Sequence, residues 1–305
     1  MPNYSPFQVV VEGNDSSNWF LQDAAGSSFI FGYGGVDVIT AHATDLYLGP
    51  GSIGFYDDYF DGGEGDYDVV NYELSTTAVE VDLALDTAWR LAGNGAKYAP
   101  DHLFDIESAW GSHHGDKLKG NALANQFNGF DGDDQIWGRD GNDWISGGGG
   151  DDFVNGGADD DFVEGNAGDD RVIGGAGDDV VNGGPGADDV WGGTGADAFA
   201  YTNANSGTDT IHDFELGVDR FAFAEFGFFA EPLGNGVELS DVLGALSAAW
   251  LGGDPDDSLL IANTTQGLQT IAVVKDVSAA DMLAAIADES ILGTPPELGL
   301  GFDLV

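Results

Sequence analysis

The sequence predicts an all-β protein, a β-solenoid of Gly/Asp-rich nonapeptide repeats with a small mixed α/β region at its C-terminal end. Three observations lead to this prediction. Residues 111–200 divide into ten consecutive nine-residue repeats without a gap, each repeat begins with glycine, and position eight of each is apolar. A short fixed period of this kind indicates stacked coils, because one repeat cannot bury its apolar side chain alone.

Two further positions of the repeat are nearly constant. Aspartate occupies position six in nine of the ten repeats, and glycine occupies position four in seven of them. Glycine permits the tight turns and the close backbone approach that stacked coils require. The last three residues of each repeat are expected to form a very short strand, with the position-eight side chain turned inward. This single apolar layer is too thin to hold the coils together by itself.

The pattern G-G-x-G-x-D-x-U-x is complete in Gly147–Asn155 and in Gly174–Asn182. It resembles the calcium-binding repeat of RTX, or hemolysin-type, proteins, a family of secreted bacterial proteins. The resemblance implies a right-handed parallel β-roll with two nonapeptides per coil. It also implies export by a type I secretion machine and a location outside the cell or on its surface.

The charge of the chain calls for a cation in the folded state. The sequence has 54 acidic and 8 basic residues, a formal net charge of -46, yet 42% of it is hydrophobic and 11% aromatic, unlike a disordered acidic tail. Two carboxylates ~4 Å apart repel by about 4 kcal/mol at an effective dielectric near 20. Several such pairs would cancel a folding stability of roughly 5–15 kcal/mol. The same charge argues against nucleic acid as a partner.

The available ligands favour Ca²⁺, which binds six to eight hard oxygens, over Zn²⁺, because the chain has no cysteine and five histidines. The predicted ligands are position-six carboxylates and position-four glycines: Asp116, Asp134, Asp143, Asp152, Asp161, Asp170, Asp179, Asp188, Asp197, Gly132, Gly141, Gly150, Gly168, Gly177, Gly186 and Gly195, with Asp213 after the repeats. Residues 111–200 have a net charge of -15. About eight Ca²⁺ ions would neutralise it.

The repeat pattern weakens in its first two copies. His114 and Leu123 replace the fourth glycine, and Asn125 replaces the aspartate; Asp159 also replaces the fourth glycine in the sixth repeat. We therefore expect a cap without strong calcium sites at the first two turns, although Asp116 remains among the candidate ligands.

Residues 1–110 are expected to form a degenerate solenoid that continues into the repeats. Short strands are predicted at Phe7–Val11, Ser28–Phe31, Val36–Thr40, Val69–Tyr72 and Val79–Leu83. Gly32–Thr40 fits the nonapeptide register with Asp37 at position six, and Gly62–Val70 fits it with one inserted residue. The run Asp68–Asn128 resembles a connecting module that precedes roll repeats in many proteins of the family.

Residues 201–305 are expected to close the roll. Gly207–Phe223 resembles the closing element of secreted metalloproteases, where Asp209 and Asp213 either ligate a last ion or cap the chain. The predicted elements are a helix at Asp241–Trp250 capped by Ser240, a hairpin of Ser258–Thr264 and Leu268–Val274, and a helix at Asp281–Asp288 capped by Ser278. This region resembles the C-terminal export signal of the family.

No specific catalytic constellation is present. The sequence has no His-Glu-x-x-His, no Gly-x-Ser-x-Gly and no cysteine, and the adjacent His113 and His114 are expected to lie on a turn surface. Met1–Phe20 lacks the features of a signal peptide, and no stretch reaches the ~20 apolar residues of a membrane span.

Six side chains of the repeats, four of them aromatic, are expected to point outward from the strands. They suggest contact with a polysaccharide or with another copy of the chain, or packing under the flanking segments. They lie in two lines, Trp144, Phe162 and Val180 on one face and Trp137, Ile173 and Trp191 on the other. The sequence thus favours an extracellular calcium-binding structural or interaction protein of a surface layer, matrix or adhesion system. The alternative is a polysaccharide-active enzyme of epimerase or lyase type, or its accessory module.

Overall fold

A computed structural model of the protein describes residues 9–14, 18–21, 28–33, 37–41, 58–63, 68–201, 207–223, 243–247, 257–264, 267–278, 280–282, 284 and 292–293. The chain forms two compact units, Met1–Phe162 and Val163–Val305, and each is described by itself. The boundaries predicted at 110/111 and 200/201 stay a prediction.

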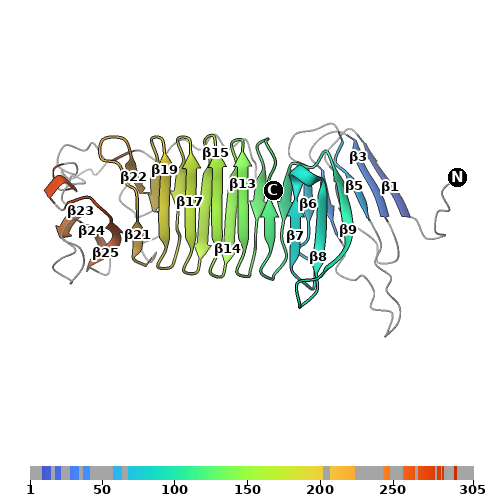
Figure 1. Ribbon diagram of the computed structural model, residues 1–305, viewed down its shortest axis with the longest axis horizontal. Helices are drawn as coiled ribbons and strands as arrows, with labels where there is room; N and C mark the ends of the chain where they lie inside the picture. Colours follow the sequence, from blue (N-terminus) through green and yellow to red (C-terminus); the bar gives the residue numbers. More distant parts are fainter. Residues whose placement is uncertain are drawn as a thin grey trace. The chain divides into compact units, whose positions relative to one another are not determined.

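The first unit consists of two β-sheets whose strands follow one another alternately along the chain (Figure 1). In spatial order, the first sheet holds β1 (Val9–Asn14), β3 (Ser28–Tyr33), β5 (Tyr59–Asp61), β9 (Lys97–Phe104), β8 (Thr87–Leu91), β7 (Val79–Asp82), β11 (Lys117–Lys119), β13 (Gln135–Asp140) and β15 (Phe153–Ala158). The second holds β2 (Trp19–Leu21), β4 (Val38–Thr40), β6 (Val69–Asn71), β10 (Ser108–Trp110), β12 (Gln126–Asn128) and β14 (Trp144–Gly149). The predicted parallel β-roll is confirmed.

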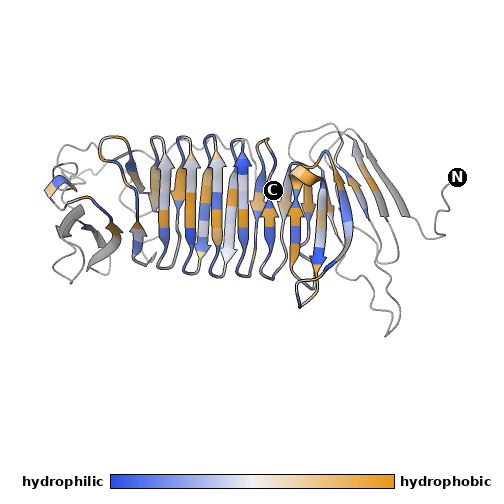
Figure 2. Cartoon of the chain, viewed as in Figure 1, coloured by the Kyte–Doolittle hydropathy of each residue, from blue (hydrophilic) through white to orange (hydrophobic). Residues whose placement is uncertain are grey.

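Strand pairing places residues of the same repeat position side by side. Leu118 pairs with Ile136, and Ile136 pairs with Val154, each 18 residues further along the chain. All ten position-eight side chains are at most 3% exposed. Two nonapeptides therefore make one coil, and position eight builds the core. Figure 2 shows the resulting apolar segments recurring along the strands of the repeats.

The N-terminal strands use the same pairing. Val70 of β6 pairs in parallel with Ile39 and with Ala109, and Ala109 pairs with Phe127 of the second repeat. The strands predicted in this region are confirmed within the described residues. One departure is an antiparallel meander of β7, β8 and β9, with a 3₁₀-helix at Leu83–Leu85 after β7.

The second unit also contains two sheets. In spatial order, the first holds β17 (Arg171–Ala176), β19 (Asp189–Thr194), β21 (Asp209–Ile211), β25 (Gly267–Val274), β24 (Ser258–Thr264) and β23 (Leu243–Ser247). The second holds β16 (Phe162–Ala167), which starts at the last residue of the first unit, β18 (Val180–Asn182), β20 (Ala198–Tyr201), β22 (Arg220–Phe223) and β26 (Leu292–Gly293).

The predicted C-terminal hairpin is confirmed, because β24 and β25 pair antiparallel. The helix predicted at Asp241–Trp250 is wrong over residues 243–247, which form β23 and pair antiparallel with β24. The local pattern favoured a helix, but an available strand edge overrides a weak local propensity, and Gly244 lowers it further. Ser240 and the rest of that segment lie outside the described residues.

Ser278 caps a helical turn as predicted. Its Oγ accepts a hydrogen bond from the Asp281 N–H at 3.2 Å, and the Met282 N–H donates to the Ser278 carbonyl at 2.9 Å. The helical residues described are 280–282 and 284. Within the described part of the chain, no helix is long and apolar enough to cross a membrane.

Candidate metal centres in the turns

The position-six side chains are buried at the start of each strand. All ten are 3% exposed or less, although aspartate is normally a surface residue. A buried carboxylate is costly unless both of its oxygens find partners. The partners of each oxygen therefore decide what these turns can bind.

The Oδ1 atoms hold neighbouring coils together. The backbone N–H of Asp134 donates to Asp152 Oδ1 at 2.7 Å, and the N–H of Asp143 donates to Asp161 Oδ1 at 2.8 Å. In the second unit, the N–H of Asp179 donates to Asp197 Oδ1 at 3.0 Å. The same bond, one coil apart, recurs for Asp116 to Asp134, Asn125 to Asp143 and Asp170 to Asp188.

Several of the position-six Oδ2 atoms are buried but accept no hydrogen bond. Among the residues that the structure describes, this holds for the Oδ2 atoms of Asp134, Asp143, Asp188 and Asp197. Leaving a buried acceptor unsatisfied costs about 1–3 kcal/mol, and more for a charged group. A repeated orphan oxygen of this kind fits a bound cation.

Position one brings a backbone oxygen of the next coil close to the position-six Oδ2. A Cβ added at Gly129 would overlap both Asp134 Oδ2 and the carbonyl oxygen of Gly147 in the next coil. A Cβ at Gly174 would likewise overlap Asp179 Oδ2 and the Gly192 carbonyl. Glycine is therefore required at position one. Across the described residues, no three or more His, Asp or Glu side chains gather as a metal cluster, so an ion here would need backbone carbonyls among its ligands.

From the third repeat onward, position two has left-handed backbone, and so has position four in all but one repeat. The predicted ligand glycines at position four have φ between 103° and 148°: Gly132, Gly141, Gly150, Gly168, Gly177 and Gly195. Gly186, which follows Pro185, is not among them, but a Cβ there would still overlap the Gly168 carbonyl. Asp159 keeps the same conformation at position four with φ 75°. The turn geometry therefore persists where the sequence departs from glycine, at a local cost of about 1–2 kcal/mol.

Burial changes the protonation of these carboxyls. It raises the pKa of Asp134 to about 8 and those of Asp143 and Asp152 to about 7. In the second unit it raises the pKa values of Asp188 and Asp197 to about 6. Neighbouring carboxylates such as Asp133 raise the pKa of Asp134 further. A cation beside Oδ2 would favour the ionised form instead.

A protein-family model described as "RTX calcium-binding nonapeptide repeat (4 copies)" matches residues 20–44, 128–163 and 164–199 of the chain. The chain carries RTX repeats. Repeats of this kind bind calcium, which agrees with the orphan oxygens of the turns. The match in the repeat region begins at residue 128, directly after the two weakest repeats.

Solved structures similar to this chain include two bacterial proteins. One is the AlgE6R3 subunit of the Azotobacter vinelandii mannuronan C5-epimerase, with 26% identity and a TM-score of 0.34, covering 50% of this chain and 86% of that one. The other is the extracellular lipase LipA of Serratia marcescens, with 15% identity and a TM-score of 0.29. This chain aligns over 92% of its own length but covers 39% of the lipase. No curated protein matches the chain.

The first two RTX repeats satisfy their position-six groups differently. Asp116 Oδ2 accepts from the Ser112 N–H, Asp116 Oδ1 accepts from the Val79 N–H at 2.6 Å, and the Ser112 hydroxyl lies 2.9 and 3.1 Å from the two oxygens. Asn125 Oδ1 accepts from the Asn121 N–H at 2.9 Å. Asn125 Nδ2 donates to the Glu107 carbonyl at 2.7 Å. In both repeats the backbone N–H of position two is a donor, and Ser112 and Asn121 lack the left-handed conformation that position two adopts in the later repeats, a difference that sequence reasoning did not predict.

Two N-terminal carboxylates repeat the RTX geometry outside the predicted ligand set. The Asp37 N–H donates to Asp68 Oδ1 at 2.6 Å, and the Oδ2 atoms of both residues are buried without a hydrogen bond. A Cβ at Gly32 would overlap Asp37 Oδ2 and the Gly62 carbonyl, as at position one of the later repeats. The register of Gly32–Thr40 already indicated Asp37, but the inserted residue in Gly62–Val70 concealed Asp68.

The two carboxylates after the repeats differ from each other. Asp209 is buried and continues the ladder, because its Oδ1 accepts from the Asp188 N–H at 3.2 Å. Asp213 uses both oxygens on the last turn, where it accepts from the N–H groups of Gly192 and Gly193 at 2.9 and 3.0 Å. Asp213 therefore caps a turn, and each of its oxygens keeps one lone pair for a cation.

The outward aromatic rings contact one another. Ring centroids are 5.5 Å apart for Trp137 and Phe153 and 4.9 Å apart for Trp144 and Phe162. In the second unit, Trp191 stacks on His212 at 4.1 Å. The ring contacts of Trp137, Trp144 and Trp191 thus run along the faces of the sheets. His113, half-exposed and 3.0 Å from Asp131 Oδ2, lies on a turn surface as predicted.

Proposed function

We propose that this protein is an extracellular calcium-binding structural or interaction protein that folds when Ca²⁺ fills its turns after type I secretion. It serves as a component of a surface layer, a matrix or an adhesion system. The observation that carries the proposal is the orphan Oδ2, which recurs at the same repeat position in Asp134, Asp143, Asp188 and Asp197.

The proposed ligands follow from that geometry. The position-six Oδ2 atoms provide carboxylate oxygen, and the turn glycines provide carbonyl oxygen. The set comprises Asp134, Asp143, Asp152, Asp161, Asp170, Asp179, Asp188 and Asp197, the position-four glycines predicted above, Asp213 and, in addition, Asp37 and Asp68. About eight ions, as expected from the charge, would neutralise the repeats.

Calcium would supply the folding free energy. An ion that binds only the folded chain stabilises it by about 2.7 kcal/mol per site at a free concentration one hundred times its dissociation constant. Weak extracellular sites bind in the range of 10⁻⁴–10⁻³ M, which millimolar extracellular calcium fills and cytosolic calcium does not. The chain would stay loose and exportable inside the cell and fold outside it.

The test is a titration of the full chain from chelator into millimolar Ca²⁺, followed by far-UV circular dichroism and size-exclusion chromatography. We expect β-structure and compaction to appear with calcium, and Mg²⁺ at the same concentration to be a poor substitute because it demands a rigid octahedral site. Equal β-content and equal compactness in chelator would overturn the proposal.

A matched pair of variants connects the effect to the turns. The double variant D134N/D143N removes two orphan carboxylates and should reduce the calcium stoichiometry measured by isothermal titration calorimetry. E73Q changes one exposed carboxylate outside the repeats and should leave the stoichiometry unchanged. An identical stoichiometry in D134N/D143N and the parent chain would contradict the ligand assignment.

A second candidate function is supported by the outer faces. Trp137 lies against Phe153, with ring centroids 5.5 Å apart, an arrangement suited to stacking on a sugar. This favours an accessory module of a polysaccharide-active enzyme of epimerase or lyase type. Calcium-loaded protein incubated with alginate should then show retention or turnover, and W137S and W191S should lose it. No difference between these variants and the parent chain would remove this candidate.

A further inference from the structure

The few basic residues of the chain are concentrated at the start of the repeats. Five of the eight lie between residues 90 and 139: Arg90, Lys97, Lys117, Lys119 and Arg139. The two repeats of residues 111–128 have one acidic and two basic residues, a net charge of +1. Residues 129–200 have 18 acidic and two basic residues, a net charge of -16. Within the ten repeats, the need for an external cation thus begins after the second one.

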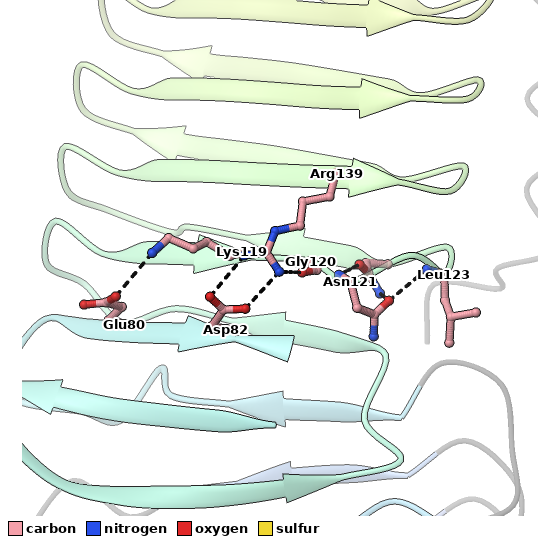
Figure 3. Close-up of polar contacts among 8 residues, drawn as sticks. Glu80, Asp82, Lys119, Gly120, Asn121, Leu123 and Arg139 are labelled. Carbon is pink, nitrogen blue, oxygen red and sulfur yellow. Dashed lines mark hydrogen bonds and ion pairs between the residues drawn. The ribbon is translucent and has the colours of Figure 1, made fainter. Parts of the chain in front are cut away.

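Arg139 provides an internal cation at this boundary. Its guanidinium forms a two-pronged pair with Asp82, with Nη1 2.9 Å from Oδ1 and Nη2 3.1 Å from Oδ2 (Figure 3). Nη1 also donates to the carbonyl oxygen of Gly120, the position-one glycine of the second repeat. A carboxylate and a turn carbonyl are the same two ligand types that the later turns offer to Ca²⁺.

The outer face of the adjoining strands is neutralised in the same way. Glu80 on β7 accepts from Lys97 at 3.0 Å and from Lys119 at 3.2 Å. Partial burial would raise the pKa of Glu80, but the bonds from these two lysines hold it below its ordinary value. This carboxylate is thus ionised and compensated without a metal.

The interior of this segment holds a buried ion pair of its own. The Tyr72 hydroxyl donates to Asp101 Oδ2 at 2.8 Å, and Arg90 Nη1 lies 3.6 Å from Asp101 Oδ1. All three residues are at most 5% exposed; Arg90 lies on β8, Asp101 lies on β9, and Tyr72 directly follows β6. Arg90 and Asp101 lie on neighbouring strands of the antiparallel meander. Their ion pair therefore forms within the meander and needs no contact from a neighbouring coil.

We infer that residues 72–128, together with Arg139, form a metal-independent cap that stays folded without calcium and provides the strand edges on which the calcium-dependent coils assemble. The inference rests on the proposed function only for the later coils. In the cap, hydroxyl, amide, ammonium and guanidinium groups fill the places that ions fill further on, as the position-six groups of Asp116 and Asn125 show. β11 and β12, the strands of the first two repeats, then offer complete edges to β13 and β14.

Hydrogen–deuterium exchange of the full chain in chelator and in millimolar Ca²⁺ tests this. In chelator, amides within 79–128 should exchange about tenfold or more slowly than those within 135–161, and in calcium both segments should be protected. Equal exchange of the two segments in chelator would overturn the cap. Protection of both segments in chelator would instead overturn calcium-driven folding, so the two failures are distinguishable.

A matched pair of variants tests the part of Arg139. R139M removes the internal cation and should raise exchange within 79–128 in chelator by about tenfold. R171M removes an arginine of β17 that lies 4.8 Å from the centroid of the Trp191 ring, and should leave exchange within 79–128 unchanged. Equal exchange in the two variants would refute the role assigned to Arg139.

A third variant keeps the inference testable even if R139M does not fold. L123G/N125D keeps Arg139 and restores the RTX pattern in the second repeat. Amides of 120–128 should then lose their protection in chelator and regain it in calcium. If they stay protected in chelator, the Asn125 contacts do not replace an ion, and the inference fails at this turn.

Discussion

The turns of residues 111–128 and those of residues 129–161 have the same period and the same buried position-eight core, yet they satisfy position six in opposite ways. In the first pair, Ser112 and Asn121 donate to the position-six oxygen. In the later turns, Oδ2 of Asp134 and Asp143 accepts no hydrogen bond. The difference teaches that the fold comes from glycine and the apolar layer, whereas the need for a cation comes from position two and position six.

The largest expected effect is the pH dependence of the chelated protein, because several carboxyls titrate together. Burial raises the pKa of Asp134 to about 8 and of Asp143 to about 7, well above the ~3.9 of an unfolded chain. The folded state therefore binds more protons, and its stability falls as pH rises through these values. In chelator, β-structure within 129–161 should appear as pH is lowered from about 8 toward 4, measured by circular dichroism and hydrogen exchange.

With calcium bound, the pH dependence of stability should have the opposite sign. An ion holds the carboxylates ionised, so protons compete with it and calcium affinity should decrease toward low pH. The first two repeats should respond weakly, because their position-six groups are hydrogen-bonded. A chelated protein that loses β-structure on mild acidification would contradict the pKa assignments.

The second-largest expected effect tests whether glycine is required at position one for steric reasons rather than for chain flexibility. G129A places a methyl group against Asp134 Oδ2 and the Gly147 carbonyl, and should lower the free energy of unfolding in calcium by about 3 kcal/mol. G93A adds the same methyl group where nothing lies within 4 Å, and should change stability by no more than about 0.5 kcal/mol. Urea unfolding in saturating calcium measures both, and comparable destabilisation would show that position one is not sterically closed.

The smallest expected effect comes from replacing one position-six aspartate in each of the two groups of turns. D143N should lower the free energy of unfolding by about 2 kcal/mol in calcium but not in chelator, because it removes an ion ligand from a buried site. D116N should destabilise residues 79–128 in both conditions, since its amide would face the Ser112 N–H. Hydrogen exchange in the two conditions reads this out, and calcium-dependent loss in D116N would return Asp116 to the ligand set.

Much of the fold was predictable because it depends on local, repeated rules. Position eight predicted the core from Leu118 to Phe199, and the hairpin of β24 and β25 was predicted from two strand-like runs on either side of Gln266-Gly267. The failed helix at residues 243–247 shows the limit, because its conformation is decided by a strand edge far along the chain. Asp68 escaped the ligand prediction for a related reason, since one inserted residue shifts the sequence register while the coil keeps its shape.

The sequence by itself determined the period, the buried column and the excess of negative charge, and with them a stacked roll that requires cations. These properties follow from residue types at fixed spacing, so they need no knowledge of distant contacts. Only the tertiary structure decided which oxygens are left without donors and which are satisfied by Ser112, Asn121 or Arg139. Ser112 and Asn121 reach oxygens four residues away in the same repeat, whereas the Val79 N–H donates to Asp116 from 37 residues away and Arg139 pairs with Asp82 across 57 residues. Spacing within one repeat carries no record of such contacts.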